Sequence, residues 1–378
     1  MTNQDDYIKE SRFQLYAHNS MQHEFFTGDP LEKNAGTGVF GRMLDVLKLR
    51  GYHTSANAVV GYGDKMLTGD QLHNNPVTTV GTVPPRELNL SPTIANLYDV
   101  VKELNGEGEL GNSFLSETWS SRVATALFEH EQMVKISNDD RFEVKNYPVG
   151  YDEQLGLQFQ AVAEYMLSRE YRNVTRDVFV VPHTGYDLHF GDALAELFLG
   201  ANDALGAFIH WAKNENLWDN TVIVMGSDFG RTMNANSNGG TDHAWGGNYF
   251  MMGGKVRGGR ILGDYPRPLS PDSPSWIGRG RFIPTTPWDA VWNGVGNWLG
   301  VPDVDMDFVL PNRYNFNKCN DLFFDKDLFT DGVCDCNTCS GAPTPPLPNP
   351  TPPPTPTPPP PTNPVSNCLL IFPFLTES

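Results

Sequence analysis

Two short apolar runs, each followed by a turn that contains glycine and acidic or His residues, constrain the fold of this chain most strongly. The first run, residues 178–181, leads into Asp187 and His189, and the second, residues 221–225, leads into Asp228. About two dozen residues with helical spacing of apolar positions lie between the runs. This alternation predicts an α/β fold with a mainly parallel sheet sandwiched by helices, in which ligands bind beyond the carboxyl ends of the strands.

The polar residues after these runs, together with a Gly-rich turn further along, are of the types that bind metal ions. Carboxylate and imidazole are ligands of Zn, Mn and Fe in hydrolytic sites, so the pattern predicts a divalent metal centre. The candidate ligands are Asp187, His189, Asp228, Asp242 and His243. Structural alternatives exist. Asp187 can cap the following helix with His189 at the surface, Asp228 can cap a helix or pair with Arg231, and residues 242–243 can form a local polar turn.

The charge balance and the hydropathy pattern limit the partners of the chain. Lys and Arg number 27 and Asp and Glu 45, which gives a formal net charge of -18. Such a surface repels phosphate backbones, so we expect no nucleic-acid partner. No run approaches the roughly 20 apolar residues of a membrane-spanning helix, so we expect no membrane span. The first ten residues lack the basic flank and apolar centre of a signal peptide.

The cysteines argue for an oxidising compartment. Four of the five lie at Cys319, Cys334, Cys336 and Cys339, and none lies in the first 318 residues. This distribution predicts two disulfides in a small knot appended to a cysteine-free body, as in secreted or cell-surface proteins. A zinc knuckle is the alternative, although the spacing lacks two clean Cys-x-x-Cys pairs. Glycosylation sequons at Asn89 and Asn173 add weak support.

Composition divides the chain into five segments. They are a disordered start (1–12), an α/β domain (13–315), a Cys-rich acidic segment (316–340), a Pro-rich linker (341–365) and a short apolar tail (366–378). Residues 343–364 carry 14 of the 30 prolines, which predicts a semi-rigid spacer and a candidate partner-binding segment. The tail is too short to span a bilayer, and we interpret it as a partner-binding stub or part of a further domain.

Periodicity and turn residues place the elements inside the α/β domain. The predicted helices cover 38–50, 95–104, 116–137, 151–169, 191–216 and 288–299. The predicted strands cover 56–60, 178–181, 221–226 and 249–252. Residues 61–95 and 255–287 are rich in Gly and Pro and predict loops.

The central motifs resemble the "domain of unknown function 1501" family, a branch of the alkaline phosphatase and sulfatase superfamily. The matching motifs are Asp187-Leu-His189, Ser227-Asp-Phe-Gly-Arg-Thr232, Asn236-Ser-Asn-Gly-Gly-Thr-Asp-His243 and Gly253-Gly-Lys-Val-Arg-Gly-Gly259. Residues 23–28 and 38–42 match the family more loosely. The likeness covers roughly residues 12 to 315 and implies an alkaline phosphatase/sulfatase-like sheet with metal ligands on loops at one edge.

The resemblance also implies roles for single residues. Asp187, His189, Asp228 and His243 would bind a divalent ion (Zn, Mn, Fe or Ca), with Asp242 as a supporting or alternative ligand. Arg231 would hold an anionic oxygen of the substrate, as a guanidinium fork does well. His18 and His23 flank residues 19–22 and can approach the site from the N-terminal side, and His23 is the catalytic candidate of the two.

The resemblance therefore predicts a metal-dependent hydrolase of a small anionic ester or a sulfated or phosphorylated glycan. The chain also departs from the family, because the first strand, which carries an early metal-binding Asp and the nucleophile, is not recognisable before Phe13. We therefore expect these 378 residues to show weak or no esterase activity. The alternative is that the chain is a non-catalytic protein on the same fold, secreted or at the cell surface, with a binding or scaffold function.

Overall fold

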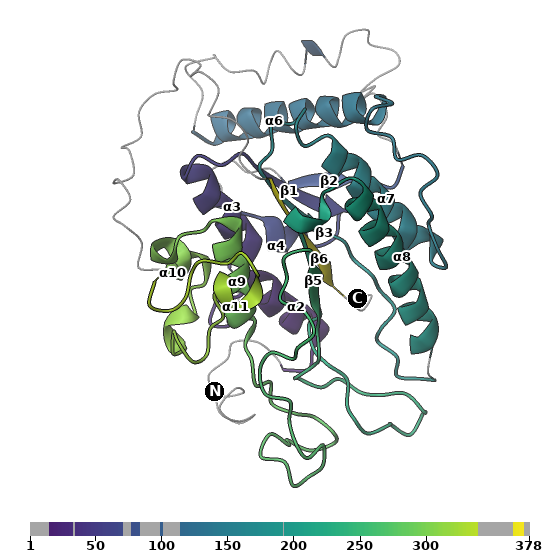
Figure 1. Ribbon diagram of the computed structural model, residues 1–378, viewed down its shortest axis with the longest axis vertical. Helices are drawn as coiled ribbons and strands as arrows, with labels where there is room; N and C mark the ends of the chain where they lie inside the picture. The colour runs from purple at the N-terminus through teal and green to yellow at the C-terminus, as the bar shows by residue number, and fades with distance from the viewer. Residues whose placement is uncertain are drawn as a thin grey trace.

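A computed structural model describes residues 15–32, 35–70, 77–83, 99–100, 114–191, 193–338 and 366–373. The described residues form one six-stranded sheet with the order β2-β1-β3-β6-β4-β5 (Figure 1). The strands are β1 (Thr54–Val59), β2 (Val77–Val80), β3 (Arg176–Val180), β4 (Thr221–Gly226), β5 (Met251–Gly253) and β6 (Asn367–Pro373). Neighbouring strands pair in parallel except β4 and β5, which are antiparallel. The chain is therefore an α/β protein with a mostly parallel sheet, as predicted.

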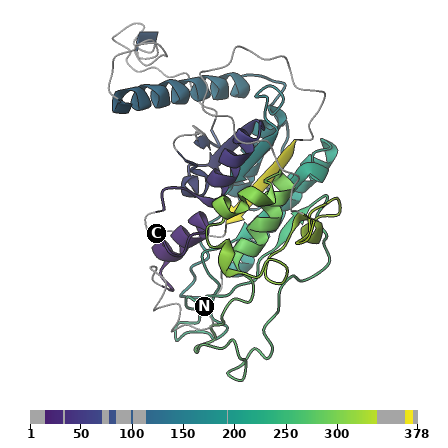
Figure 2. The ribbon, with the colours of Figure 1, turned by 90° about the vertical axis from the view of Figure 1, so that its left-hand side faces the viewer.

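Helices cover both faces of this sheet because successive side chains of each strand point to opposite sides. One face packs on α3 (Val39–Leu49) and α9 (Trp288–Leu299), and the other on α7 (Glu153–Leu167) and α8 (Leu194–Asn214). Figure 2 looks onto the face with α3 and α9 in front of the strands. The predicted helices at these four places are confirmed, and so is α6 (Phe114–Ser137), which crosses one end of the layers (Figure 1).

Shorter helices join these layers. The one that matters most for the site is α2 (His18–Thr27), which precedes α3 in the chain. The others are α4 (Asp64–Leu67), α10 (Met306–Val309) and α11 (Asp325–Leu328), with three 3-10 turns at Trp218–Asn220, Asp303–Asp305 and Arg313–Asn315. None of the helices in the described ranges is both long enough and apolar enough to cross a membrane.

The structure corrects the prediction of a loop over residues 61–95. This stretch contains α4 and also β2, which forms an edge of the sheet beside β1. The stretch is rich in Gly, Pro, Asn and Thr, so four-residue elements within it leave little periodic signal. Most of the helix predicted at 95–104 lies outside the described residues, as do the predicted disordered start, Asn89 and the whole Pro-rich linker.

The largest correction concerns the short apolar tail. Residues 367–373 form β6, which lies in the middle of the sheet between β3 and β4 and pairs in parallel with both. An apolar run of this length fits a strand buried on both faces as well as it fits a tail, and length alone does not separate the two. The structure thus places this segment in the core of the α/β domain.

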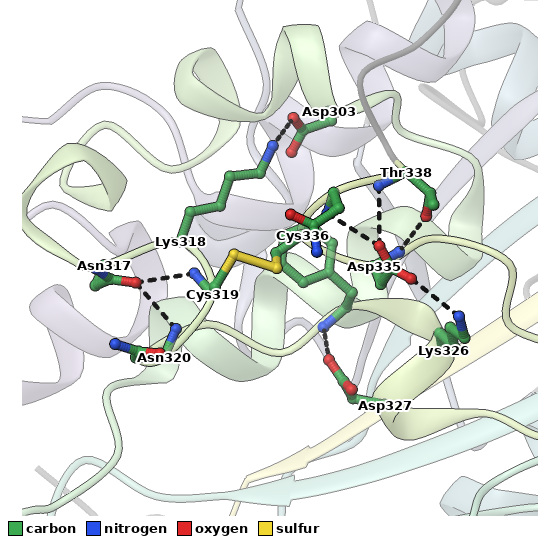
Figure 3. Close-up of a disulfide and its surroundings, with 12 residues drawn as sticks. Asp303, Asn317, Lys318, Cys319, Asn320, Lys326, Asp327, Asp335, Cys336 and Thr338 are labelled. Carbon is green, nitrogen blue, oxygen red and sulfur yellow. Dashed lines mark hydrogen bonds and ion pairs between the residues drawn. A yellow bond between two sulfur atoms is a disulfide. The ribbon is translucent and has the colours of Figure 1, made fainter.

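The Cys-rich acidic segment also packs on the domain. Cys319 and Cys336 form a disulfide, and Lys318 and Lys326 pair with Asp303 and Asp335 at 2.6 and 2.9 Å (Figure 3). Leu322 and Phe324 of this segment bury against Ala290 of α9. Cys334 is disulfide-bonded as well, and Cys339 lies outside the described residues. The prediction of disulfides is therefore confirmed for Cys319 and Cys336.

Candidate metal centre

The candidate site lies where β3 and β4 end, beside the first turn of α2. Asp187 and His189 lie on the loop after β3, and Asp228 lies directly after β4. A short antiparallel bridge places Arg231 opposite His243. Backbone bonds between residues 230–232 and 242–245 hold this ribbon together. The loops are therefore fixed by main-chain pairing, which lets side chains from distant segments converge.

Four side chains meet at the centre of this site. The ligand atoms of His18, Asp187 and His243 all lie within 4.8 Å of one another, a spacing that could hold a metal ion. His18 Nε2 is 3.1 Å from His243 Nε2 and 3.4 Å from Asp187 Oδ2. His189 Nε2 lies 2.9 Å from His243 Nε2 and 3.0 Å from Asp187 Oδ1. The structure thus brings three of the predicted ligands together and adds His18.

The opposite ring nitrogen of each His faces an acceptor. His18 Nδ1 lies 2.7 Å from Asp228 Oδ2, and His243 Nδ1 lies 2.8 Å from the backbone oxygen of Tyr16. His189 Nδ1 lies 3.4 Å from Asp242 Oδ1. A carboxylate or carbonyl on one ring nitrogen fixes the proton there and leaves the other nitrogen as a ligand. All three rings are therefore set to present Nε2 to the centre.

This arrangement of acceptors fits a bound cation. With the protons on Nδ1, the Nε2 atoms of His18, His189 and His243 and the carboxylate of Asp187 all present lone pairs to one another. Such contacts at 2.9–3.4 Å repel unless a positive charge lies among them. Ligands about 2.0–2.1 Å from a tetrahedral zinc ion lie about 3.3 Å apart, close to these separations. The ligand atoms of His18, Asp187 and His243 are therefore spaced so that they could hold a metal ion.

Asp228, another predicted ligand, lies next to this cluster and contacts His18. Its side chain is 2 % exposed, and Oδ2 contacts Nδ1 of His18 and the amide of Gln22, at 2.7 and 3.4 Å. Oδ1 accepts hydrogen bonds from the backbone N–H of Phe229 and the hydroxyl of Ser227, each 3.0 Å long. Asp228 therefore orients the His18 ring from behind, as second carboxylates do in metal centres.

Arg231, the residue predicted to hold an anionic oxygen of the substrate, lies beside Asp187. Its guanidinium donates hydrogen bonds to Asp187 and to the hydroxyl and carbonyl of Thr241. Burial favours a higher pKa for Asp187, but the Arg231 hydrogen bond and charge, with smaller contributions from His243 and His189, hold that pKa below its usual value. Arg231 therefore keeps Asp187 ionised and positioned.

Asp242 links the cluster to a depression on the surface. Its carboxylate accepts hydrogen bonds from Asn236 and Arg279 at 3.1 and 2.6 Å, and the Asn236 bond is the main reason that its pKa lies below its usual value. Arg279 is 68 % exposed. The depression has a volume of about 680 Å³ and is lined by His189, Phe190, Ala235, Asn236, Ser237, Asn238, Asp242 and Arg279.

His23 occupies a different place from the cluster. It lies on α2 five residues after His18, about 140° around a helix of 3.6 residues per turn, so the two rings point in different directions. Burial and the nearby Lys65 charge lower the pKa of His23, with a smaller opposing effect from Glu32. Gln22, four residues after His18, shares its face and contacts Asp228.

Residues 55–269 match the model of a family described as "Protein of unknown function (DUF1501)". The chain belongs to this family. The match contains Asp187, His189, Asp228, Asp242 and His243 and stops short of α2 and β6. No curated protein and no solved structure matches the chain.

Proposed function

We propose that this protein is a metal-dependent hydrolase of phosphate or sulfate esters, with an alkaline phosphatase/sulfatase-like fold. The observation that carries the proposal is the convergence of three His Nε2 atoms on Asp187, each with its Nδ1 already facing an acceptor. Imidazole ligands favour Zn, Mn or Fe over Ca, which takes oxygen ligands. We therefore narrow the expected cofactor to a divalent transition metal.

The charges around the cluster suit an anionic substrate. Asp187 is neutralised by Arg231, and Asp242 by Arg279, which leaves Asp228 as the remaining acidic group of the site. A divalent ion would make this set of side chains positive by about one charge, in a protein whose formal net charge is -18. When bound, the ion supplies a Lewis acid that stabilises developing negative charge on a substrate oxygen.

The depression beside His189 provides contacts for the rest of the substrate. Arg279 and the amide of Asn238 offer donors for sulfate, phosphate or sugar hydroxyl oxygens. The Phe190 ring, 72 % exposed at the same rim, offers an apolar face for a sugar or aryl ring. These contacts support a small anionic ester or a sulfated or phosphorylated glycan as the substrate class.

The disulfide supports a secreted or cell-surface location for this activity. Disulfides persist in oxidising compartments and are rare in reducing ones. The Cys319–Cys336 bond lies in a segment that packs on the domain and so contributes to the folded state of the whole unit. A sulfated or phosphorylated glycan is a substrate available outside the cell.

One experiment tests the proposed activity. The purified full chain is depleted of metal, reloaded with Zn²⁺, Mn²⁺ or Fe²⁺, and assayed for metal content and for release from aryl phosphate and aryl sulfate. We expect about one ion per chain and slow turnover that His243→Ala abolishes. His210→Ala, on the surface of α8, is the matched control and should retain both properties. Metal binding without turnover of either ester would favour the non-catalytic binding protein.

A further inference from the structure

β6 is the last strand in the sequence, yet it lies inside the sheet between two earlier strands. β6 pairs with β3 through residues 176–180 and with β4 through residues 221–226, so it joins two strands that flank it on either side. Residues 339–365, 27 positions, separate it from the rest of the described chain. We call the space between β3 and β4 that β6 fills the β3–β4 slot.

The β3–β4 slot is strongly apolar on both faces. Leu369 and Ile371 pack into the core layer with α3 and α9, and Leu370 and Phe372 pack into the layer with α7 and α8. All four side chains are fully buried. At about 1.5–3 kcal/mol each, their burial contributes on the order of 6–12 kcal/mol. An empty slot is therefore very unfavourable, and each molecule needs a strand to fill it.

The strand in the β3–β4 slot also contacts the segment that follows β3 and leads to the candidate site. The His183 ring stacks on the Phe372 ring with centroids 6.0 Å apart. The backbone N–H of His183 donates a hydrogen bond of 3.1 Å to the carbonyl of Pro373. His183 lies four residues before Asp187. Filling the slot therefore fixes both the sheet and the start of the site loop.

The length of the intervening tract lets a strand reach beyond its own molecule. Twenty-seven residues span at most about 90 Å, whereas a globular chain of this length has a diameter of roughly 50 Å. Residues 343–364 contain 14 prolines, and Pro-rich tracts are stiff spacers. A tether of this length lowers the concentration of a strand at its own slot, so a slot on a neighbouring molecule can compete with it.

We propose that the β3–β4 slot accepts β6 from a second copy of this chain as well as from its own, so that two copies exchange this strand reciprocally. The contacts of β6 are the same in both arrangements. The equilibrium between them therefore depends on protein concentration and on the tether, as for other exchanged elements. The partner is a second copy because the slot fits the sequence of β6 on both faces.

A cross-link to the native Cys368 tests this exchange in the full chain. Cys368 is buried and is a free thiol, and it pairs in register with Thr221 of β4. Adjacent strands lie about 4.8 Å apart, within the Cα range of a disulfide. Thr221→Cys therefore places two thiols so that a bond forms within one chain when the strand is its own, and between two chains when it is exchanged. Thr221→Cys with Cys368→Ser is the control without this bond.

The protein is refolded at several concentrations, oxidised, and separated without reductant, and the bond is located by peptide mapping. We expect covalent dimers linked between residues 221 and 368, increasing at least about fivefold in fraction between 1 and 100 µM, as a bimolecular equilibrium requires. Cross-linked monomers alone at every concentration would overturn the proposal. If the Thr221→Cys chain fails to fold, light scattering of the unaltered protein decides instead, with dimers expected at 100 µM and monomers throughout as the contrary result.

Discussion

His18 Nδ1 lies 2.7 Å from Asp228 Oδ2, across 210 residues of sequence. This pair joins α2 to the end of β4 and turns Nε2 of His18 toward Asp187 and His243. Its consequence is a division of labour among the acidic residues. Asp187 faces the centre with the three rings, whereas Asp228 and Asp242 hold rings from behind. This arrangement leaves His18, Asp187 and His243 spaced so that they could hold a metal ion.

This division predicts a graded loss of metal affinity. Replacing a residue behind a ligand weakens metal binding about 10–100-fold, and replacing the ligand itself weakens it further. We therefore expect His18→Ala to lose more affinity than Asp228→Asn, which should lose about 10–100-fold, while His23→Ala keeps nearly all of it. Titration of the metal-free chain with Zn²⁺ against a competing chelator measures each affinity. Equal losses in His18→Ala and His23→Ala would contradict the assignment.

A second prediction concerns substrate binding in the depression. A charged hydrogen bond contributes about 1.5–3 kcal/mol when buried, and less at a site as exposed as Arg279, so we expect a roughly tenfold loss of affinity. Arg279→Gln should raise KM for an aryl phosphate or sulfate by that factor and leave the metal content unchanged. Arg141→Gln, an exposed Arg that pairs with Asp139, is the control. A drop in metal content in Arg279→Gln would show that Arg279 acts on the centre instead.

Most of the core of the site was predictable because its residues lie near one another in sequence. Asp187 and His189 follow one strand, and Asp228 and His243 follow the next within 57 positions, so a single parallel crossover brings them together. His18 belongs to a helix that reaches the cluster from the far N-terminal side, and no local pattern connects it with β4. The sequence did indicate that His18 and His23 cannot both reach the site. On a helix, residues 18 and 23 point in different directions, whereas residues 18 and 22 share a face.

The fold was predictable where elements that follow one another in the sequence also pack together. The prediction failed for β6, whose neighbours in the sheet lie far away in the sequence. β3, β4, α7 and α8 alternate along the chain, so their periodicity gives both type and neighbourhood. β6 has the apolar composition of a buried strand, but its neighbours in the sheet are about 150 to 190 residues away. Propensity indicates what such a segment is, and only tertiary packing determines where it lies.

A third prediction concerns the disulfide. Cys319 and Cys336 close a loop with a sequence separation of 17, for which the chain-entropy model gives about 3 kcal/mol of stabilisation. The double variant Cys319→Ser/Cys336→Ser should lower the free energy of unfolding by about that amount in a urea titration. Reduction of the unaltered chain should lower it at least as far, because Cys334 is disulfide-bonded as well. A chain equally stable with and without reductant would argue against a structural role for the bond.

The fourth prediction concerns the pH dependence of stability and rests on Asp289. This residue lies in the first turn of α9, is buried, and its Oδ1 lacks a hydrogen-bond partner among the described residues. Burial, and to a smaller extent the charge of Glu24, raise its pKa to about 7 from an ordinary value of 3.8, although Arg42 opposes the shift. The folded state therefore holds a proton that the unfolded state releases between about pH 4 and pH 7.

Because the folded pKa is the higher one, the stability present below about pH 4 is lost as the pH rises toward 7 and beyond. Asp289→Asn removes the ionisation, so we expect this variant to exceed the unaltered chain in stability at pH 8 by on the order of a few kcal/mol, at about 1.4 kcal/mol per pKa unit. The two should be nearly equal at pH 4. Urea titrations at both pH values measure the difference, with the exposed Asp272→Asn as control. A stability gain for Asp289→Asn of the same size at pH 4 and pH 8 would show that shape, and not charge, limits the stability at this position.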